Sequence, residues 1–194
     1  MLMPDPTVFA ILIHMKKWKT ISSKLAFDHR WFKVQQDTVE LSNGAVIDDY
    51  FMWPEGDVAM VLPVTKNNEI ILVKQYKHAA GDIVIELPAG MVDKNEAPEV
   101  AAARELREET GYTSRTLIPI AKVANNPTKV ISDIHIYLAE NVEKTEDTQL
   151  DHNEEIEVLV KPYKQVLEMI YTGEIRISGS ISAIFIGLKK LGLL

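Results

Sequence analysis

Short apolar runs separated by turn residues divide most of the chain into strand-like segments. The runs 30–41 and 45–53 flank Asn43-Gly44, a dipeptide typical of a hairpin turn. The segment Pro54–Asp57 then interrupts the pattern. Further β-rich runs follow, at 58–65, 69–77, 83–87, 116–124, 133–139 and 156–160.

Helical patterns appear once between these strands and twice after them. A proline in the first turn and Gly111 as a stop predict a helix over 98–110, and two more helices are expected at 163–172 and 181–191. This order predicts a mixed α/β fold of the α+β kind, in which helices sandwich a mixed β-sheet. We expect two parts: residues 1–56, a leader and an antiparallel β-hairpin subdomain, and residues 57–194, the main domain.

Composition and charge narrow the classes of function. The chain has 194 residues, is 46% hydrophobic and carries a net charge of −7, so a broad basic face for nucleic acid is not expected. It has no cysteine, which excludes disulfides and thiolate sites and is consistent with a cytoplasmic protein. The apolar run Val8–Ile13 is too short to span a membrane, and the lysines that follow it do not match a signal peptide, so no membrane association is expected.

Carboxylates gather on the helix expected at 98–110. Residues three and four apart are neighbours on a helix, so Glu105 is expected beside both Glu108 and Glu109. Their mutual repulsion, close to the negative end of the helix dipole, would be relieved by a hard divalent cation such as Mg²⁺. A solvated face with salt bridges to Arg104 and Arg107 would also explain these charges. The same helix is expected to turn Ala102, Ala103 and Leu106 toward the sheet.

The wider spacing around these glutamates resembles the Nudix box. The pattern of this family places Gly90, Glu96, the run Arg104–Glu109 and Gly111 at its specified positions. Tyr112 departs from the family pattern, which prefers an aliphatic residue there. The resemblance implies the Nudix fold and cleavage of a nucleoside diphosphate that is linked to another group.

The resemblance also implies roles for individual residues. Glu105, Glu108, Glu109 and the carbonyl of Ala89 are implied as ligands of Mg²⁺, with Mn²⁺ as a possible substitute. Arg104 is implied to hold the glutamates in position, and Glu96 is implied to support the helix.

Three features outside the box resemble the ADP-sugar pyrophosphatase branch of this family, which acts on ADP-ribose and related substrates. Lys77 stands where the branch usually has an arginine, and Glu86 matches a glutamate near the substrate. Pro127 matches a proline that accompanies ADP-ribose activity, although Ser132 replaces a glutamate that often follows it. In this branch the N-terminal strands pair between two subunits, so a homodimer is expected, with Trp31, Phe32 or Trp53 as candidates to stack on the base.

The general base is expected in the acidic loop before the last strand. In the ADP-sugar branch the base lies on such a loop, and the resemblance of the closing Ile-Glu-Val to that branch implies this role for Glu154, with Glu155 next in order. Two alternatives to an ADP-sugar pyrophosphatase stay open: a Nudix hydrolase for another nucleoside diphosphate sugar, such as a GDP-hexose, and a non-catalytic sensor that binds ADP-ribose. A sensor is expected to lose box glutamates, and none is lost here.

Overall fold

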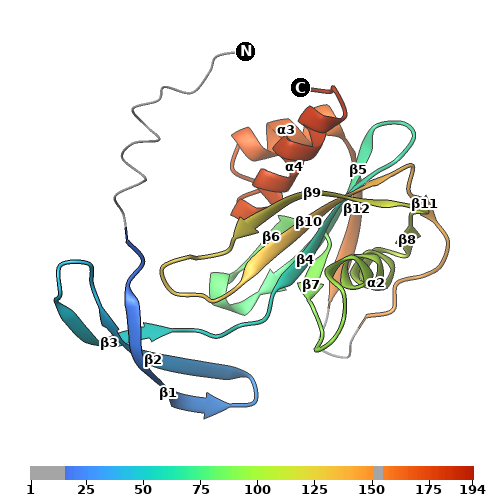
Figure 1. Ribbon diagram of the computed structural model, residues 1–194. Coiled ribbons are helices and arrows are strands. Elements are labelled where there is room, and N and C mark those ends of the chain that lie inside the picture. Colours follow the sequence, from blue (N-terminus) through green and yellow to red (C-terminus); the bar gives the residue numbers. More distant parts are fainter. Residues whose placement is uncertain (1–15, 151–154) are drawn as a thin grey trace, which may run out of the picture. The chain divides into compact units, whose positions relative to one another are not determined.

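The computed structural model describes residues 16–150 and 155–194, whose contacts divide them into two compact units (Figure 1). The first unit holds the described residues up to Glu55 and the segment Asn126–Ile131. The second unit holds Gly56–Asn125 and Ser132–Leu194, except for the residues that are not described. The division expected from the sequence, at residue 56, did not assign the segment 126–131 to the first part. This segment belongs to the first unit although it lies far along the chain from the other residues of that unit.

The first unit is an antiparallel sheet in the order β1 (Lys19–His29), β2 (Phe32–Glu40), β3 (Val46–Met52). The expected hairpin between β2 and β3 is present: Gly44 has a φ of 83° and donates its N–H to the carbonyl of Leu41 at 3.0 Å. The segment 126–131 joins the end of this sheet, where Trp53 donates its N–H to Lys129 at 2.7 Å. Strand β1 was not expected from the sequence.

The second unit is built on a mixed sheet with the strand order β12-β5-β4-β10-β9. Strand β6 pairs with β5 and β7 pairs with β4; among the described strands of this sheet, only the β4–β10 pair is parallel. The bounds are β4 (Val58–Val64), β5 (Glu69–Lys77), β6 (Asp82–Glu86), β7 (Ala89–Met91), β9 (Leu117–Ala124), β10 (Asp133–Glu140) and β12 (Ile156–Pro162). Short elements complete the unit: the 3-10 turn η1 (His78–Ala80) and the two-stranded sheet of β8 (Tyr112–Thr113) and β11 (Glu143–Lys144).

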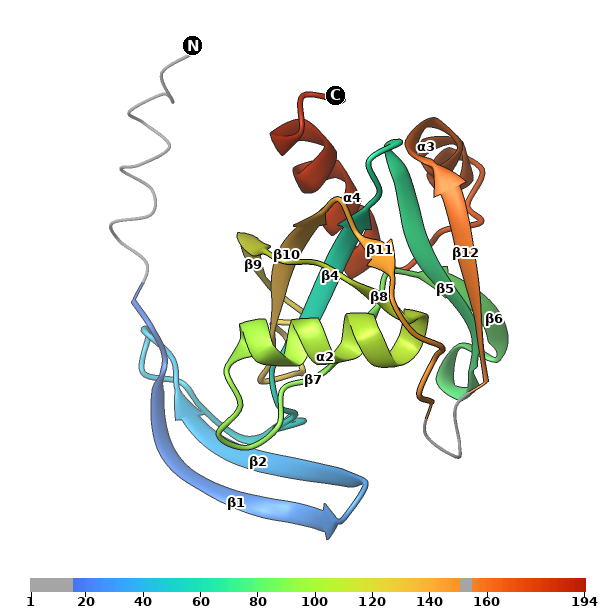
Figure 2. The ribbon, with the colours of Figure 1, turned by 90° about the vertical axis from the view of Figure 1, so that its right-hand side faces the viewer.

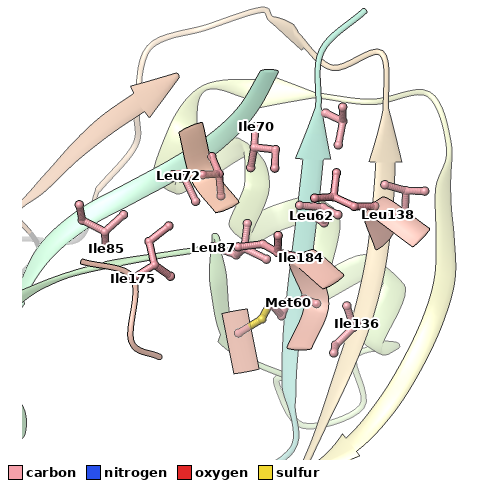
Figure 3. Packing of buried hydrophobic residues seen from close by; sticks show 14 of the residues in the cluster. Met60, Leu62, Ile70, Leu72, Ile85, Leu87, Ile136, Leu138, Ile175 and Ile184 are labelled. Atoms are coloured by element: carbon pink, nitrogen blue, oxygen red, sulfur yellow. The ribbon is translucent and has the colours of Figure 1, made fainter. Parts of the chain in front are cut away.

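Helices cover both faces of this sheet, as expected. Helix α2 (Pro98–Thr110) crosses one face, and α3 (Tyr163–Tyr171) and α4 (Ser178–Lys190) cover the other (Figure 2). The larger core lies under α3 and α4, where Leu62, Leu72 and Ile184 are fully buried (Figure 3). Among the described residues, no helix is long and apolar enough to cross a membrane.

Helix α2 packs against the sheet through a stripe that contains two of the three expected residues. Ala101, Ala102 and Leu106 are buried, whereas Ala103 is exposed, so the expectation for Ala103 was wrong. Successive residues of a helix are rotated by about 100° around its axis, so Ala103 points away from the sheet. Leu106 and Glu109, one and two turns after Ala102, point toward it again. This stripe ends on Glu109, which is therefore turned toward the sheet.

Candidate functional site

Glu109 is a carboxylate on the buried face of α2. Only 5% of it is exposed, and its Oε2 accepts the backbone N–H of Ala89 at 3.1 Å. Burial raises the pKa of Glu109 to about 8, and the nearby charge of Glu105 adds to this effect. A negative charge at this position is therefore unfavourable unless a positive group compensates it.

The Nudix-box glycine Gly90 leaves room for the carboxylate of Glu105. A Cβ atom at Gly90 would lie 2.0 Å from Glu105 Oε1, so any larger residue would push this carboxylate aside. Gly90 belongs to β7, which pairs with β4 and so fixes its backbone beneath α2. Strand β7 and helix α2 thus hold the carboxylate of Glu105 against the backbone of Gly90, where no side chain lies between them.

Arg104 links the glutamates of the box to one another. Its side chain donates to Glu96 at 3.0 and 3.1 Å, to Glu105 at 2.6 Å and to Glu108 at 3.3 Å. The hydrogen bonds from Arg104 lower the pKa of Glu96, and those same bonds raise the pKa of Arg104. Glu96 also accepts the N–H of Asp93 at 3.0 Å, so it fastens the loop before α2 to the helix.

The neighbouring strands β5 and β6 add charged groups beside α2. Lys77 Nζ lies 3.4 Å from Glu86 Oε1, and the charges of both residues affect the pKa of Glu109. Gln75 donates to the same Glu86 oxygen at 3.1 Å. The structure therefore places Lys77, Glu86 and Gln75 near the carboxylates of α2. The roles of Lys77 and Glu86 in substrate binding stay predictions, and Gln75 was not singled out from the sequence.

The residues present fit a divalent cation. Within residues 16–150 and 155–194, no three acidic or histidine side chains are already drawn together around one point. Arg104 instead takes up oxygens of Glu105 and Glu108. Carboxylate oxygens are the ligands that hard cations prefer, and a cation would also compensate the buried charge of Glu109. Glu105, Glu108 and Glu109 would hold it, and a role for the carbonyl of Ala89 stays a prediction.

The remaining candidates belong to the first unit, to the residue before β12, or to the residues that are not described. Trp31 and Pro127 belong to the first unit, where Trp31 is 74% exposed and Pro127 lies in an exposed turn. Glu154 lies outside the described residues. Glu155 is exposed just before β12 and lines a hollow with Tyr76 and Glu157. The roles of these four residues stay predictions.

A set of contacts at the C-terminal end of α2 was not predicted from the sequence. Arg107 lies between Glu108 and Glu146, and Gln149 contacts both the helix and Glu146. These partners are about 40 residues apart in sequence, so helical spacing could not indicate them.

Comparison with known proteins agrees with this geometry. A family model described as the NUDIX domain matches residues 54–177, and one described as the nucleoside diphosphate sugar hydrolase N-terminal domain matches residues 18–52. The crystal structure of an ADP compounds hydrolase has the same fold, with a TM-score of 0.81 and 22% identity over 93% of this chain and 98% of that one.

Curated relatives match most of the chain. An ADP-ribose pyrophosphatase of Bacillus subtilis is 34% identical over 81% of this chain and 85% of its own length. A methanol dehydrogenase activator of Bacillus methanolicus is 34% identical, with 86% and 90% covered. A GDP-mannose pyrophosphatase of Klebsiella pneumoniae is 30% identical, with 84% and 85% covered. Together with the family models, these matches show that this chain belongs to the Nudix family.

Proposed function

We propose that this Nudix hydrolase cleaves the diphosphate bond of ADP-ribose with the help of Mg²⁺ and releases AMP and ribose 5-phosphate. The observation that carries the proposal is the gathering of Glu105, Glu108 and Glu109 on α2 next to the Lys77–Glu86 pair. Nudix hydrolases generally need a divalent metal ion. When bound, such an ion neutralises the diphosphate and lowers the pKa of a water molecule.

The residues of the chain supply orientation and charge. Arg104 fixes the directions of the Glu105 and Glu108 carboxylates. Lys77 offers a positive charge to a phosphate, although its ammonium lacks the two-pronged geometry of the arginine usual in the ADP-sugar branch. Glu86, held by Gln75, offers a hydrogen-bond acceptor to a hydroxyl of the substrate.

A second candidate substrate is a GDP-hexose. Lys77 and Ser132 both depart from the pattern that accompanies ADP-ribose, and one of the relatives is a GDP-mannose pyrophosphatase. A non-catalytic sensor receives no such support, because every box glutamate is present and held in place.

A product assay tests both candidates. We expect AMP and ribose 5-phosphate from ADP-ribose in the presence of Mg²⁺, with Mn²⁺ as a substitute and no turnover after chelation. ADP-glucose, GDP-mannose, NADH and a nucleoside triphosphate complete the panel. A higher kcat/KM for GDP-mannose than for ADP-ribose would select the second candidate, and no turnover of any substrate would contradict the proposal.

The proposal includes a general base outside the box, on Glu154 or else Glu155. A positioned carboxylate that takes the proton of the attacking water is worth roughly 10²–10⁴-fold in rate. We therefore expect Glu154→Gln to lower kcat by this factor and to leave Mg²⁺ affinity unchanged, with Glu155→Gln as the matched control. A large loss in Glu155→Gln alone would move the role by one residue, and near-normal rates in both variants would place the base elsewhere.

We also propose a homodimer that acts in the cytoplasm. The lack of cysteine supports the compartment. The exposed apolar side chains of the first unit support the dimer.

A further inference from the structure

The segment 143–149 runs along the C-terminal end of α2. The N–H groups of Thr145 and Glu146 point to the carbonyl of Gly111 at 2.9 and 3.3 Å, and Gln149 donates its N–H to the carbonyl of Glu108 at 2.8 Å. Carbonyls at a helix end have no partner within the helix, and here the segment provides one. The backbone of a candidate metal ligand, Glu108, is therefore fastened to this segment.

Side chains make a second connection between the same two elements. Arg107 donates from its Nη2 to Glu108 Oε1 at 3.1 Å, and its Nε lies 3.7 Å from Glu146 Oε1. The amide of Gln149 donates to the other oxygen of Glu146 at 2.6 Å. The charge of Arg107 is thus divided between Glu108 and Glu146, and Gln149 fixes the direction of Glu146.

This division matters because Arg107 and a divalent cation compete for the same carboxylate. A guanidinium is always charged and matches a carboxylate with two parallel hydrogen bonds. Arg104 already donates to Oε2 of Glu108. Without the negative charge of Glu146, Arg107 would turn fully to Oε1, and neither oxygen of Glu108 would be left for a cation.

We propose that Glu146 is a positioning residue for cation binding, which acts by drawing Arg107 partly away from Glu108. The inference rests on the proposed function only in assigning a divalent cation to the α2 glutamates. Residues that orient metal ligands from behind typically change metal affinity by 10–100-fold.

The test measures Mn²⁺ binding to the substrate-free protein by electron paramagnetic resonance. We expect Glu146→Gln to weaken Mn²⁺ binding about tenfold and Gln149→Ala to weaken it in the same direction but less. The matched control is Asp147→Asn, which removes one negative charge from the same segment. The Asp147 side chain is fully exposed and pairs only with Lys144, at 3.9 Å, among the described residues, so its loss should change Mn²⁺ binding less than about twofold.

A double-variant comparison separates positioning from a general charge effect. In an Arg107→Gln background, adding Glu146→Gln should change Mn²⁺ affinity little, because Glu146 acts through Arg107. With Mg²⁺ saturating, the kcat of Glu146→Gln should return to within about twofold of the wild type, since the metal ligands themselves are intact. The melting temperature without metal should shift by no more than about 3 °C, because a half-exposed ion pair contributes little.

Three outcomes would overturn the inference. These are unchanged Mn²⁺ binding in both Glu146→Gln and Gln149→Ala, an equal loss in Asp147→Asn, or a full further loss when Glu146→Gln is added to Arg107→Gln. A wild-type protein that binds Mn²⁺ but cleaves no nucleoside diphosphate sugar would refute the proposed function and leave this inference standing.

Discussion

Glu109 is the residue where packing and function conflict most clearly. Its carboxylate occupies a buried position that an apolar residue would fill at lower cost, and burial raises its pKa to about 8. The proposed role of Glu109 as a metal ligand would account for a carboxylate that opposes packing in this way.

Replacement of Glu109 by glutamine therefore separates folding from turnover. We expect turnover to fall by at least about 100-fold, because a neutral amide is a poor ligand for a hard cation. The melting temperature in the presence of a chelator should equal or exceed that of the wild type. At neutral pH, folding forces the Glu109 carboxyl to take up a proton or to bury its charge, whereas an amide is neutral at every pH. Glu99→Gln, an exposed change in the first turn of the same helix, is the control. It should leave turnover unchanged and lower the melting temperature slightly, because it removes a favourable charge from the N-terminal end of the helix dipole. Wild-type turnover in Glu109→Gln would remove this residue from the metal site.

Asp57 gives a prediction on pH. The hydrogen bond with His135 Nε2 at 2.7 Å, and after it the N–H of Asp133 at 3.0 Å, lower the pKa of Asp57 from its ordinary value of 3.8. A carboxylate with a lowered pKa in the folded state stabilises the protein above its unfolded pKa, and this contribution is lost as pH falls through the folded value.

The free energy of unfolding of the wild type should therefore exceed that of Asp57→Asn at pH 5.5, and the difference should shrink below pH of about 3.8. The side chain is 40% exposed, so solvent screening limits the difference to about 1 kcal/mol. Urea unfolding of both proteins across this range measures it, with Asp147→Asn as an exposed control. A difference that grows toward low pH would contradict the assignment.

The residues of the site were predictable where their relation is local. Glu108 and Glu109 lie three and four residues after Glu105 on one helix, a spacing that a sequence displays directly. Gln75 and Glu146 act on partners in other elements, so their roles depend on a tertiary arrangement that the spacing does not contain.

At the scale of elements, the C-terminal end of α2 is fixed by one glycine for two reasons. Gly111 has a φ of 73°, and a Cβ atom there would lie 2.2 Å from the carbonyl oxygen of Glu146. Gly173, after α3, has a φ of 80° but no atom within 4 Å of its would-be Cβ. Substitutions at the two glycines therefore distinguish the cost of backbone strain, which is present at both, from the cost of a close contact, which is present at Gly111 alone.

Alanine substitution should cost more at Gly111 than at Gly173. The left-handed conformation costs about 1–2 kcal/mol at either position, and the collision with the segment 143–149 adds roughly 1–3 kcal/mol at Gly111 alone. Denaturant unfolding measures both losses. Asparagine, which tolerates a positive φ, should recover much of the stability at position 173 and little at 111. Equal losses in the two alanine variants would show that the close approach to Glu146 carries no cost.

A helix or strand can be predicted from the sequence when its residues follow a regular pattern with clear end signals. The helix over 98–110 was predicted at its observed bounds because Pro98 and Gly111 mark its two ends. Strand β1 was missed because its pairing with β2 shifts register between Thr20 and Ser22 and again between Leu25 and Phe27. Each shift breaks the alternation of period two by which a strand is recognised. Strands β8 and β11, of two residues each, are too short to show any period.

At the scale of the whole molecule, the first unit exposes an unusual number of apolar side chains. Strand β1 lies at the edge of its sheet, and on it Ile21, Leu25 and Phe27 are each more than half exposed. Trp31, in the turn that follows, is 74% exposed. An exposed edge with apolar side chains is prone to pair with another chain, and a second copy of the same chain is the simplest partner.

We therefore expect light scattering to report a homodimer at micromolar concentration. A stable interface buries about 800 Å² on each partner, so a charge placed within it should weaken the dimer strongly. Leu25→Glu and Phe27→Glu should each shift the protein toward monomer and leave its circular dichroism unchanged, because both side chains already contact solvent. Tyr171→Glu is the matched control, since Tyr171 is 69% exposed at the end of α3, in the second unit. A monomeric wild type would refute the homodimer, and a dimer of full strength in both β1 variants would place the interface elsewhere on the molecule.

If the partner's Trp31 also stacks on the base of the substrate, the two β1 variants should raise KM for ADP-ribose at concentrations where they are monomers, while kcat at saturating substrate falls less.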